Sequence, residues 1–266
     1  MKQKPAWAKA LCVVALMGLS ANAAAEIKWT FKTGGVATGT SNGNSRQYSG
    51  NALGAPTVIG TAWSNTADGP SGANTVIQDA YLGSYSGGLG VTNRDPNAGD
   101  LGEGSSPEHS TDNNDRYDSV LFSFSQAIDV NKVEIGWRST DSDITVLAYT
   151  GANVPVIADK TYSQLTSSGW TLVGHYANLA TNTPMSVNDA NLSSAYWIVG
   201  AYNPTVGGSA GWTIGDDYVK ILALYGDNAP PPPHSTPEPS AAAMLVPGLL
   251  GIALTRRNLR RRRNQT

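Results

Sequence analysis

Cysteine is almost absent from this chain of 266 residues, which contains only Cys12. One cysteine cannot form an intramolecular disulfide, and no pair of cysteines is present that could help to hold a metal. The stability of the fold must therefore come from burial of apolar side chains, from hydrogen bonds, or from a bound ion. Cys12 directly follows Leu11 near the start of an apolar segment. A lipid-modified cysteine stands after a small residue at the end of such a segment, so we expect no lipidation.

The segment around Cys12 is typical of a secretory signal peptide. A basic leader, an apolar core and a run of small residues follow one another as Lys2, Lys4 and Lys9, then Ala10–Leu19, then Ser20–Ala25. This order marks a segment that is removed on export. Cleavage after Ala23 or after Ala25 satisfies the A-x-A rule, and we favour Ala25. We predict a signal peptide at residues 1–25, with a mature amphipathic helix as the alternative.

The sequence near its end also lacks a hydrophobic run that is long enough to span a membrane with certainty. Ala241–Leu254 has no charged residue, but it is 14 residues long, whereas a spanning helix needs about 20. A cluster of six arginines follows it: Arg256, Arg257, Arg260, Arg261, Arg262 and Arg263. Such a cluster holds its end of a segment on the cytoplasmic side. We predict a short, marginal transmembrane segment at 241–254; a core helix is the alternative, which the arginines disfavour.

The order of features in residues 237–266 resembles the PEP-CTERM sorting signal. The tripeptide Pro237, Glu238 and Pro239 comes first, and the apolar segment and the arginine cluster follow. The resemblance implies a substrate of an exosortase, which would cut near this tripeptide. It also implies a precursor held at the inner membrane and a mature form at the cell surface or outside the cell. Such systems accompany exopolysaccharide production.

Basic residues are scarce between the two ends. The segment from Glu26 to Glu238 holds all 20 acidic residues but nine of the 18 basic ones, so its formal charge is nine minus 20, or −11. Nucleic acids and anionic lipids bind clustered lysine and arginine, which this segment lacks. The acidic surface is compatible with a soluble exported domain and with divalent cations. A proline-rich stretch at 229–236 is predicted to be a semi-rigid linker.

Helical periodicity is absent from residues 26–228, where no apolar pattern repeats at helical spacing over three turns. Alternating patterns predict strands at 27–33, 57–63, 75–82, 85–92, 118–125, 130–138, 143–149, 170–176, 196–202 and 218–225. The polar stretch 34–53 is predicted as a long loop or an irregular edge, 93–118 as a loop, and 162–168 as one helical turn. We therefore expect an all-β domain, a single antiparallel β-sandwich of jelly-roll type, with a closed barrel as the alternative.

Phenylalanine is rare, with three residues against 18 tyrosines and tryptophans together. A tyrosine or tryptophan ring buries a large apolar area while its OH or NH group reaches a hydrogen-bond partner, so we expect most of these rings in the core. A surface that stacks sugar rings would use the same residue types. Several stretches of the domain also look like exosortase-dependent surface proteins: residues 80–92, 107–109, 112–118, 136–137, 141–144 and 147–151. That resemblance implies surface display and supplies no catalytic residues.

Oxygen-bearing side chains crowd one loop and the mouth of a later strand. They are Asp112, Asn114, Asp115, Asp118, Asp141 and Asp143. Calcium takes 6–8 oxygen ligands, and loops on a rigid β-domain can converge to supply them. The spacing is not that of an EF-hand, and N-caps, Asx-turns and solvated loops are the alternative use of these residues. We predict a candidate Ca²⁺ site here and require no other cofactor.

Hydrolytic chemistry has weaker support. Gly207–Gly211 matches G-x-S-x-G around Ser209, but a glycine-rich loop precedes it and no helical pattern follows, as the nucleophile elbow requires. The histidines His109, His175 and His234 have no zinc spacing. With 20 carboxylates, a glycosidase-like pair carries no information without geometry. We expect a non-enzymatic surface or matrix protein; the alternative is a Ca²⁺-stabilised carbohydrate-binding or adhesive module.

Overall fold

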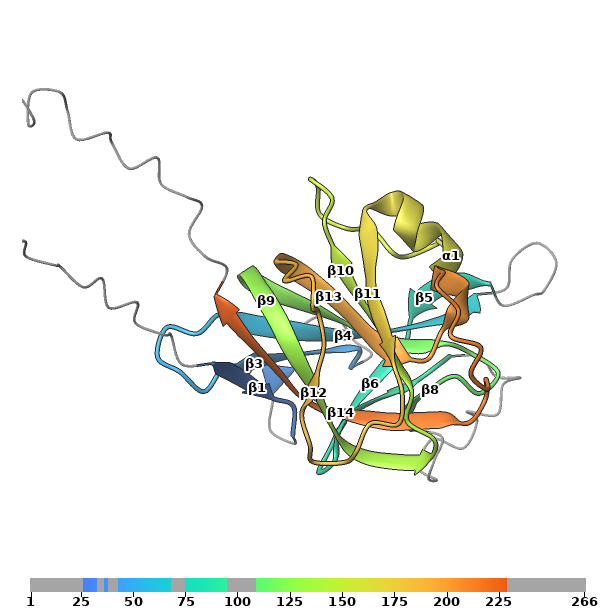
Figure 1. Cartoon of the computed structure of the whole chain (residues 1–266), viewed down its shortest axis with the longest axis horizontal. Coiled ribbons are helices and arrows are strands. Elements are labelled where there is room, and N and C mark those ends of the chain that lie inside the picture. The colour runs from blue at the N-terminus through green and yellow to red at the C-terminus, as the bar shows by residue number, and fades with distance from the viewer. Residues whose placement is uncertain (1–25, 33–35, 38–42, 68–74, 95–108, 229–266) are drawn as a thin grey trace, which may run out of the picture.

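The computed structural model of this chain describes residues 26–32, 36–37, 43–67, 75–94 and 109–228 (Figure 1). The predicted signal peptide, linker and sorting signal lie outside the described residues. Among the helices that are described, none combines the length and the apolar character needed to cross a membrane. The described part consists mainly of antiparallel strands, which confirms the prediction of an all-β protein.

The strands of the described residues belong to one hydrogen-bonded sheet. In chain order they are β1 (Ile27–Thr30), β2 (Val36–Ala37), β3 (Ser45–Ser49), β4 (Thr57–Ala67), β5 (Val76–Asp79), β6 (Tyr81–Tyr85), β7 (Gly88–Thr92), β8 (Thr111–Asp112), β9 (Asp118–Thr140), β10 (Ile144–Tyr149), β11 (Trp170–Tyr176), β12 (Met185–Ser186), β13 (Ser194–Ala201) and β14 (Asp217–Asn228). The short helix α1 (Tyr162–Leu165) and the 3₁₀ turn η2 (Thr166–Ser168) confirm the predicted helical turn at 162–168. A second 3₁₀ turn, η3, spans Pro204–Val206.

Strand β9, 23 residues long, organises the sheet. One of its edges pairs with β13 and then β12, and the other pairs with β4 up to Phe124 and with β14 from Ile128 onward. The prediction of two separate strands, 118–125 and 130–138, is therefore wrong. Ile128 pairs with both Ser194 and Asn228, so the polar residues between the predicted strands mark a change of partner rather than a break.

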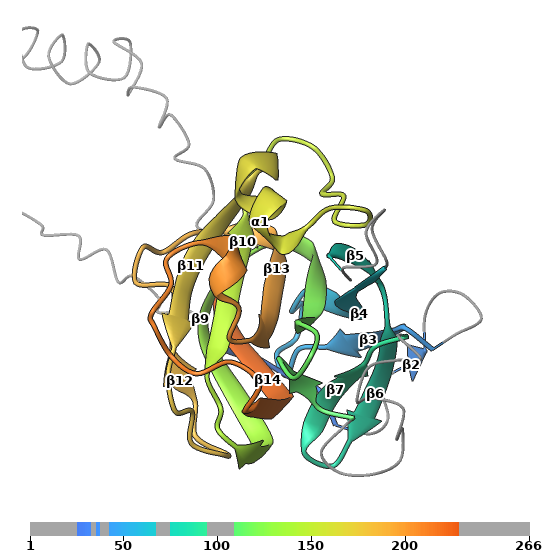
Figure 2. The same ribbon diagram turned by 90° about the vertical axis from the view of Figure 1, so that its right-hand side faces the viewer.

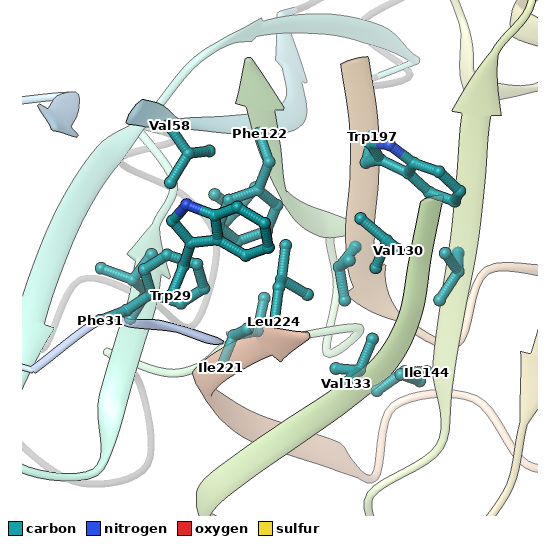
Figure 3. Close-up of a cluster of buried hydrophobic side chains, with 14 of the residues drawn as sticks. Trp29, Phe31, Val58, Phe122, Val130, Val133, Ile144, Trp197, Ile221 and Leu224 are labelled. Atoms are coloured by element: carbon teal, nitrogen blue, oxygen red, sulfur yellow. The ribbon is translucent and has the colours of Figure 1, made fainter. Parts of the chain in front are cut away.

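Beyond β9 the sheet divides into two branches. Strand β4 continues to β3 and β5, while β14 continues to β1, β7 and β8, and β7 pairs with β6. Side chains from both branches belong to one buried cluster. Figure 3 shows Trp29 and Phe31 between Val58 and Phe122 on one side and Ile221 on the other. The main core is thus enclosed between the β4 branch and the β14 branch.

The predicted buried faces agree with the structure in β9 and β10. Val120 and Phe122 are fully buried, as are Val133 and Ile135 farther along β9. In β10 the opposite face is buried as well, because Leu147 belongs to a second cluster that includes residues of α1 and η3. Figure 2 shows α1 beside β10 and β11. Strand β10 is therefore covered on both faces, which simple alternation does not predict.

Three predicted boundaries need correction. The stretch 34–53, predicted as a loop or irregular edge, contains β2 and β3, because the polar strand Ser45–Ser49 pairs with both β2 and β4 and buries Tyr48. The single strand predicted at 75–82 divides at Ala80 into β5, which pairs with β4, and β6, which pairs with β7. The predicted loop at 93–118 contains β8, which pairs with β14; residues 95–108 lie outside the described residues.

The two ends of the described domain lie side by side. Ile27 at the start of β1 pairs with Gly226 near the end of β14, and the antiparallel ladder continues to Thr30 and Ala223. A salt bridge of 2.8 Å from Lys28 Nζ to Glu134 Oε2 attaches β1 to β9 across this end of the sheet. Any segment attached before β1 or after β14 therefore leaves the domain at the same end.

Trp29 tests how far the core depends on a single side chain. It is fully buried, its indole Nε1 donates to Pro56 O at 2.7 Å, and its ring meets Phe124 edge-on at 4.9 Å. Replacing it by alanine removes this burial and leaves a cavity, so we expect Trp29→Ala to lower the free energy of unfolding by about 3–5 kcal/mol. Urea denaturation of the full-length chain in mild detergent, followed by far-UV circular dichroism, measures this loss.

The matched control is Leu53→Ala, which truncates a fully exposed apolar side chain in the same domain. Its effect should stay within about 0.5 kcal/mol. A loss for Trp29→Ala no larger than that of the control would contradict the assignment of Trp29 to the core.

Candidate metal centre

Three aspartates from two distant parts of the sequence converge at one end of β9. Asp141 follows β9, Asp143 precedes β10, and Asp217 begins β14. Because β9 and β14 are antiparallel and Thr140 pairs with Asp217, the residues that follow β9 lie beside the start of β14. Asp141 and Asp217 form a β-bridge. One carboxylate oxygen from each of the three aspartates lies within 4.8 Å of the others.

Backbone groups fix the orientation of each carboxylate. Asp141 Oδ1 accepts a hydrogen bond from Ser142 N at 2.7 Å, and Asp143 Oδ1 accepts one from Asn178 N at 2.7 Å. The Asp217 Oδ1 atom accepts one from Asp143 N, also at 2.7 Å. These bonds use part of the acceptor capacity of each carboxylate, which has about four lone-pair sites. The cluster is thus pre-oriented and keeps oxygen capacity for a cation.

Asn113 connects this cluster to the neighbouring loop. Its Nδ2 atom donates to Asp217 Oδ2 at 2.7 Å and to Tyr202 O at 3.0 Å. Its Oδ1 atom accepts from Gly215 N at 3.0 Å and from Asp217 N at 3.1 Å. The side chain is buried, and all of its hydrogen-bonding groups are in use. Asn113 therefore determines where the segment 215–217 lies relative to the loop that follows β8.

The electrostatics of the cluster disfavour three full negative charges. Asp143 is 3% exposed and Asp217 is fully buried. Burial, assisted by the charges of Asp143 and Asp141, raises the pKa of Asp217 to about 7 despite the hydrogen bonds from Asp143 N and Asn113. Burial also raises the pKa of Asp143, and the charges of Asp141 and Asp216 add to this effect. Within the described residues no lysine or arginine forms an ion pair with the three aspartates. A proton or a metal ion is the remaining means of neutralising them.

The six residues predicted for the cation site divide among different places. Asp141 and Asp143 lie in the cluster, where Asp217 joins them. Asp112 lies in β8, and its Oδ1 atom accepts a hydrogen bond from Asn114 N at 3.1 Å, which supports the following turn. Asn114 and Asp115 line an open pocket beside the cluster, and that pocket also includes Asn113. The structure thus places Asn114 and Asp115 next to the cluster without making them part of it.

Asp118 lies apart from the other predicted residues, at the start of β9. It is buried and lines a small, partly open cavity of about 10 Å³, together with Tyr162 and Asn203. The next residue, Ser119, places its Oγ atom 2.8 Å from Tyr162 Oη. A cavity of this size is close to the smallest that holds one water molecule. Its surroundings are those of an internal polar contact between β9 and α1.

The loop around Ser209 lacks the contacts of an activated nucleophile. Ser209 Oγ lies 3.3 Å from Tyr202 Oη and accepts a hydrogen bond from Gly211 N at 3.3 Å. His175 does lie beside this loop, which the sequence alone does not predict. Its Nε2 atom lies 2.9 Å from Gly207 O, and its Nδ1 atom lies 2.9 Å from Thr145 Oγ1. Because both ring nitrogens contact other groups, the arrangement is not a serine–histidine pair.

Neither of the two histidines in the described part of the chain, His109 and His175, belongs to the three-aspartate group. His109 packs against Tyr85, with ring centroids 4.7 Å apart. His175 meets Tyr202 edge-on at 5.0 Å, and His234 lies outside the described residues. The three-aspartate group contains oxygen ligands alone, a donor set that suits Ca²⁺ or Mg²⁺ better than Zn²⁺.

Sequence reasoning missed two residues that shape this centre, Asp217 and Asn113. The pair Asp216 and Asp217 stands directly before the predicted strand 218–225, and acidic residues at a strand end were the only local signal. Their meeting with Asp141 and Asp143 depends on the pairing of β9 with β14. That pairing joins residues far apart in the sequence, so strand patterns alone could not place Asp217 in the cluster.

The raised pKa of Asp217 gives a signed dependence of stability on pH. An unfolded aspartate has a pKa of about 3.9, whereas the pKa of Asp217 is about 7 in the fold. Between these values the folded state binds more protons, so the stability from protonated Asp217 is full below about pH 4 and is lost by about pH 7. We expect the unfolding free energy of the native chain minus that of Asp217→Asn to fall over this range and then level off.

Urea denaturation of both proteins in metal-free buffers from about pH 4 to pH 8 measures this difference. Any loss of stability from the asparagine amide itself is the same at every pH, so it does not change the slope of the difference with pH. The control is Asp189→Asn, which changes an exposed aspartate outside the cluster. A difference for Asp217→Asn that is flat, or that rises with pH, would show that Asp217 ionises normally.

Comparison of this chain with family models, with curated proteins and with solved structures finds no match. Its function must therefore be inferred from its own residues and their arrangement.

Proposed function

We propose that this chain is the precursor of a non-enzymatic protein of the cell surface or extracellular matrix. It is exported through the inner membrane, held there by its C-terminal segment, and processed by an exosortase near Pro237, Glu238 and Pro239. The mature protein associates with exopolysaccharide or biofilm. The observation that carries the proposal is the order of the last thirty residues: acidic tripeptide, apolar segment, arginine cluster. Each part has a physical role, since the apolar segment enters the bilayer and the arginines set its orientation.

Residues 26–228 form the domain that this route would display, and we assign it to the β-sandwich class with a jelly-roll-like arrangement. The support is one buried cluster to which both branches of the sheet contribute, for example through Val58 of β4 and Leu224 of β14. The excess of acidic residues keeps such a domain soluble and repels nucleic acid. A closed barrel remains the alternative, because β6 also approaches β3, where Tyr48 Oη donates a hydrogen bond to Ser84 Oγ at 3.3 Å.

The direction of β14 supports a display role. Asp217 and Asn228 are the two ends of this strand, and at about 3.3 Å per residue they are roughly 35 Å apart. The linker at 229–236 would continue from the Asn228 end. A domain attached through that linker would hold the aspartate cluster at the end farther from the membrane.

A second candidate function is a Ca²⁺-stabilised carbohydrate-binding or adhesive module. The specific observation in its favour is the convergence of Asp141, Asp143 and Asp217, with one oxygen of each within 4.8 Å of the others. Three carboxylates supply fewer oxygens than the 6–8 that Ca²⁺ takes, so backbone carbonyls and water would complete the shell. The two candidates are compatible, since a displayed domain without cysteine gains stability from an ion that binds its folded state.

The sorting proposal is tested by mutation of the tail. In a producing cell, Glu238→Ala and replacement of the six C-terminal arginines by glutamine should each leave uncut precursor in the membrane fraction. The first change removes the acidic centre of the predicted cleavage motif, and the second removes the charges that set the topology. Intact mass spectrometry of the surface and membrane fractions measures the outcome, including both ends of any mature form.

His234→Ala is the matched control, because it changes a polar residue of the linker and leaves the motif intact. It should mature like the native chain. Appearance of the mature form of Glu238→Ala with its normal C-terminus would rule out the sorting proposal.

The metal proposal predicts stabilisation by calcium. At a free concentration a hundredfold above Kd, binding to the folded state alone adds about 2.7 kcal/mol, which raises Tm by about 5–10 °C for a domain of this size. Differential scanning calorimetry of the full-length chain in mild detergent, with Ca²⁺ and with a chelator, measures the shift. Asp143→Asn should lose most of it, because the change removes one negative charge and one ligand oxygen from the cluster.

The exposed Asp189→Asn variant should keep the full shift. Because Ca²⁺ must displace the proton of Asp217, whose pKa is about 7, the shift should also shrink as the pH falls below about 7. Equal shifts for the native chain and for Asp143→Asn would place the calcium elsewhere.

A further inference from the structure

An open pocket of about 300 Å³ lies next to the aspartate cluster. It is lined by Asn113, Asn114, Asp115, Tyr117, Ile214 and Gly215. Two loops supply these residues, the one between β8 and β9 and the one before β14. Its volume lies at the small end of the range for pockets that bind small molecules, about 300–1,000 Å³. The space therefore suits one small ring better than an extended peptide.

The polar groups of this pocket are available to a ligand. The amide of Asn114 and the carboxylate of Asp115 have no hydrogen-bond or ion-pair partner among the described residues. The amide offers both donors and acceptors, and the carboxylate offers acceptors alone. Such a mixture matches hydroxyl groups, each of which donates once and accepts twice. The bonds that these two residues form within the fold, to Asp112 and to Arg116, use backbone groups, and both side chains line the pocket.

An apolar surface accompanies these polar groups. Ile214 is 50% exposed, although most large aliphatic side chains of the described residues are buried. Tyr117 is partly buried, with its ring edge-on to Tyr162 at 6.3 Å, so one portion of the ring is supported from behind. A tyrosine ring combines an apolar face with a polar tip. The pocket thus offers carbon surface beside hydrogen-bonding groups, as the two sides of a sugar ring require.

Charge restricts the ligand further. The lining contains one carboxylate and no lysine, arginine or histidine. The acidic cluster adjoins it through Asn113, which bonds to Asp217. The Asp115 carboxylate disfavours an anionic ring such as a uronic acid or a sugar phosphate. We propose that this pocket binds a neutral hexose unit of an extracellular polysaccharide.

The walls of the pocket are fixed before a ligand arrives. Asn113 holds Gly215 and Asp217 on one side, and Asp112 Oδ1 holds Asn114 N on the other. Tyr117 N donates to Asn65 Oδ1 at 2.6 Å, which attaches the end of this loop to β4. A pre-formed site loses little conformational entropy on binding, so even a few contacts can hold a ligand. The cluster that would take the cation also anchors one wall of the pocket.

The location of the pocket agrees with this ligand. It lies at the Asp217 end of β14, opposite the end from which a linker would continue. This point rests on the proposed function, in which the Asn228 end faces the membrane and the other end faces the polysaccharide outside. The chemistry of the pocket does not depend on that route, so the two proposals fail separately.

Titration of the full-length chain in mild detergent with glucose, mannose and galactose tests the inference. With ¹⁵N-labelled protein, at least one hexose should shift the side-chain amide signals of Asn114 in a saturable way at millimolar concentration. Loss of apolar contact in Ile214→Ser and loss of hydrogen bonds in Asn114→Ala should each weaken binding about tenfold or more. The backbone amide signal of Gly215 reports binding in the Asn114→Ala variant.

The matched controls are Val154→Ser and Asn153→Ala, which make similar changes at exposed positions outside the pocket. They should bind like the native chain. Saturable shifts, read at Asn114 or, in Asn114→Ala, at Gly215, that weaken in the pocket variants and persist in the controls support the site. Absence of shifts with all three hexoses, or equal losses in the controls, overturns it. If the chain binds a hexose but its Glu238→Ala variant still matures, the pocket proposal is supported and the sorting proposal is ruled out.

Discussion

The length of β9, which stays one strand while its partners change, is the constraint on which the rest of the structure depends. This strand carries β13 and β12 on one edge and passes from β4 to β14 on the other. The change of partner occurs at Ile128, where the polar stretch before it stays extended. Because β4 and β14 leave the same edge in succession, their branches enclose the side chains between them. The hydrophobic core therefore follows from the length of one strand, and it forms without any disulfide.

Buried charges in this domain are neutralised in three different ways. Glu134 is 5% exposed, and although burial opposes it, hydrogen bonds from Lys28 and Tyr225 hold its pKa below the usual value. Lys220 is also 5% exposed; burial lowers its pKa, and its ammonium group lies 4.1 Å from the Trp137 ring centroid. Asp217 alone among these three faces like charges. Such a site is a place where a proton and a cation could compete, and this sets the aspartate cluster apart from the ion pair of Glu134 with Lys28.

The sequence predicts features that depend on local pattern and fails where long-range pairing decides. Alternation identifies the buried face of β9 at Phe122 and Ile135, because one face of the strand meets the core. The same rule misses β3, since Ser45–Ser49 is a polar strand whose place depends on pairing with β2 and β4. At the site, Asp141 and Asp143 are found because they stand together at a strand end. Asp217 is missed because its position follows from pairing with Thr140, which no local pattern encodes.

Strand β14 also connects the two parts of the functional proposal, which are attachment through the linker and binding at the aspartate end. Strand β14 ends at Asn228, where the linker would begin, and it starts at Asp217, which Asn113 binds. Near Asn228, β14 is paired on both sides, with β1 through Gly226 and with β9 through Val130. A load applied at the linker is therefore carried by two ladders before it reaches the aspartates. Attachment at one end and recognition at the other are then separable, because the strand that joins them is held by backbone pairing along its length.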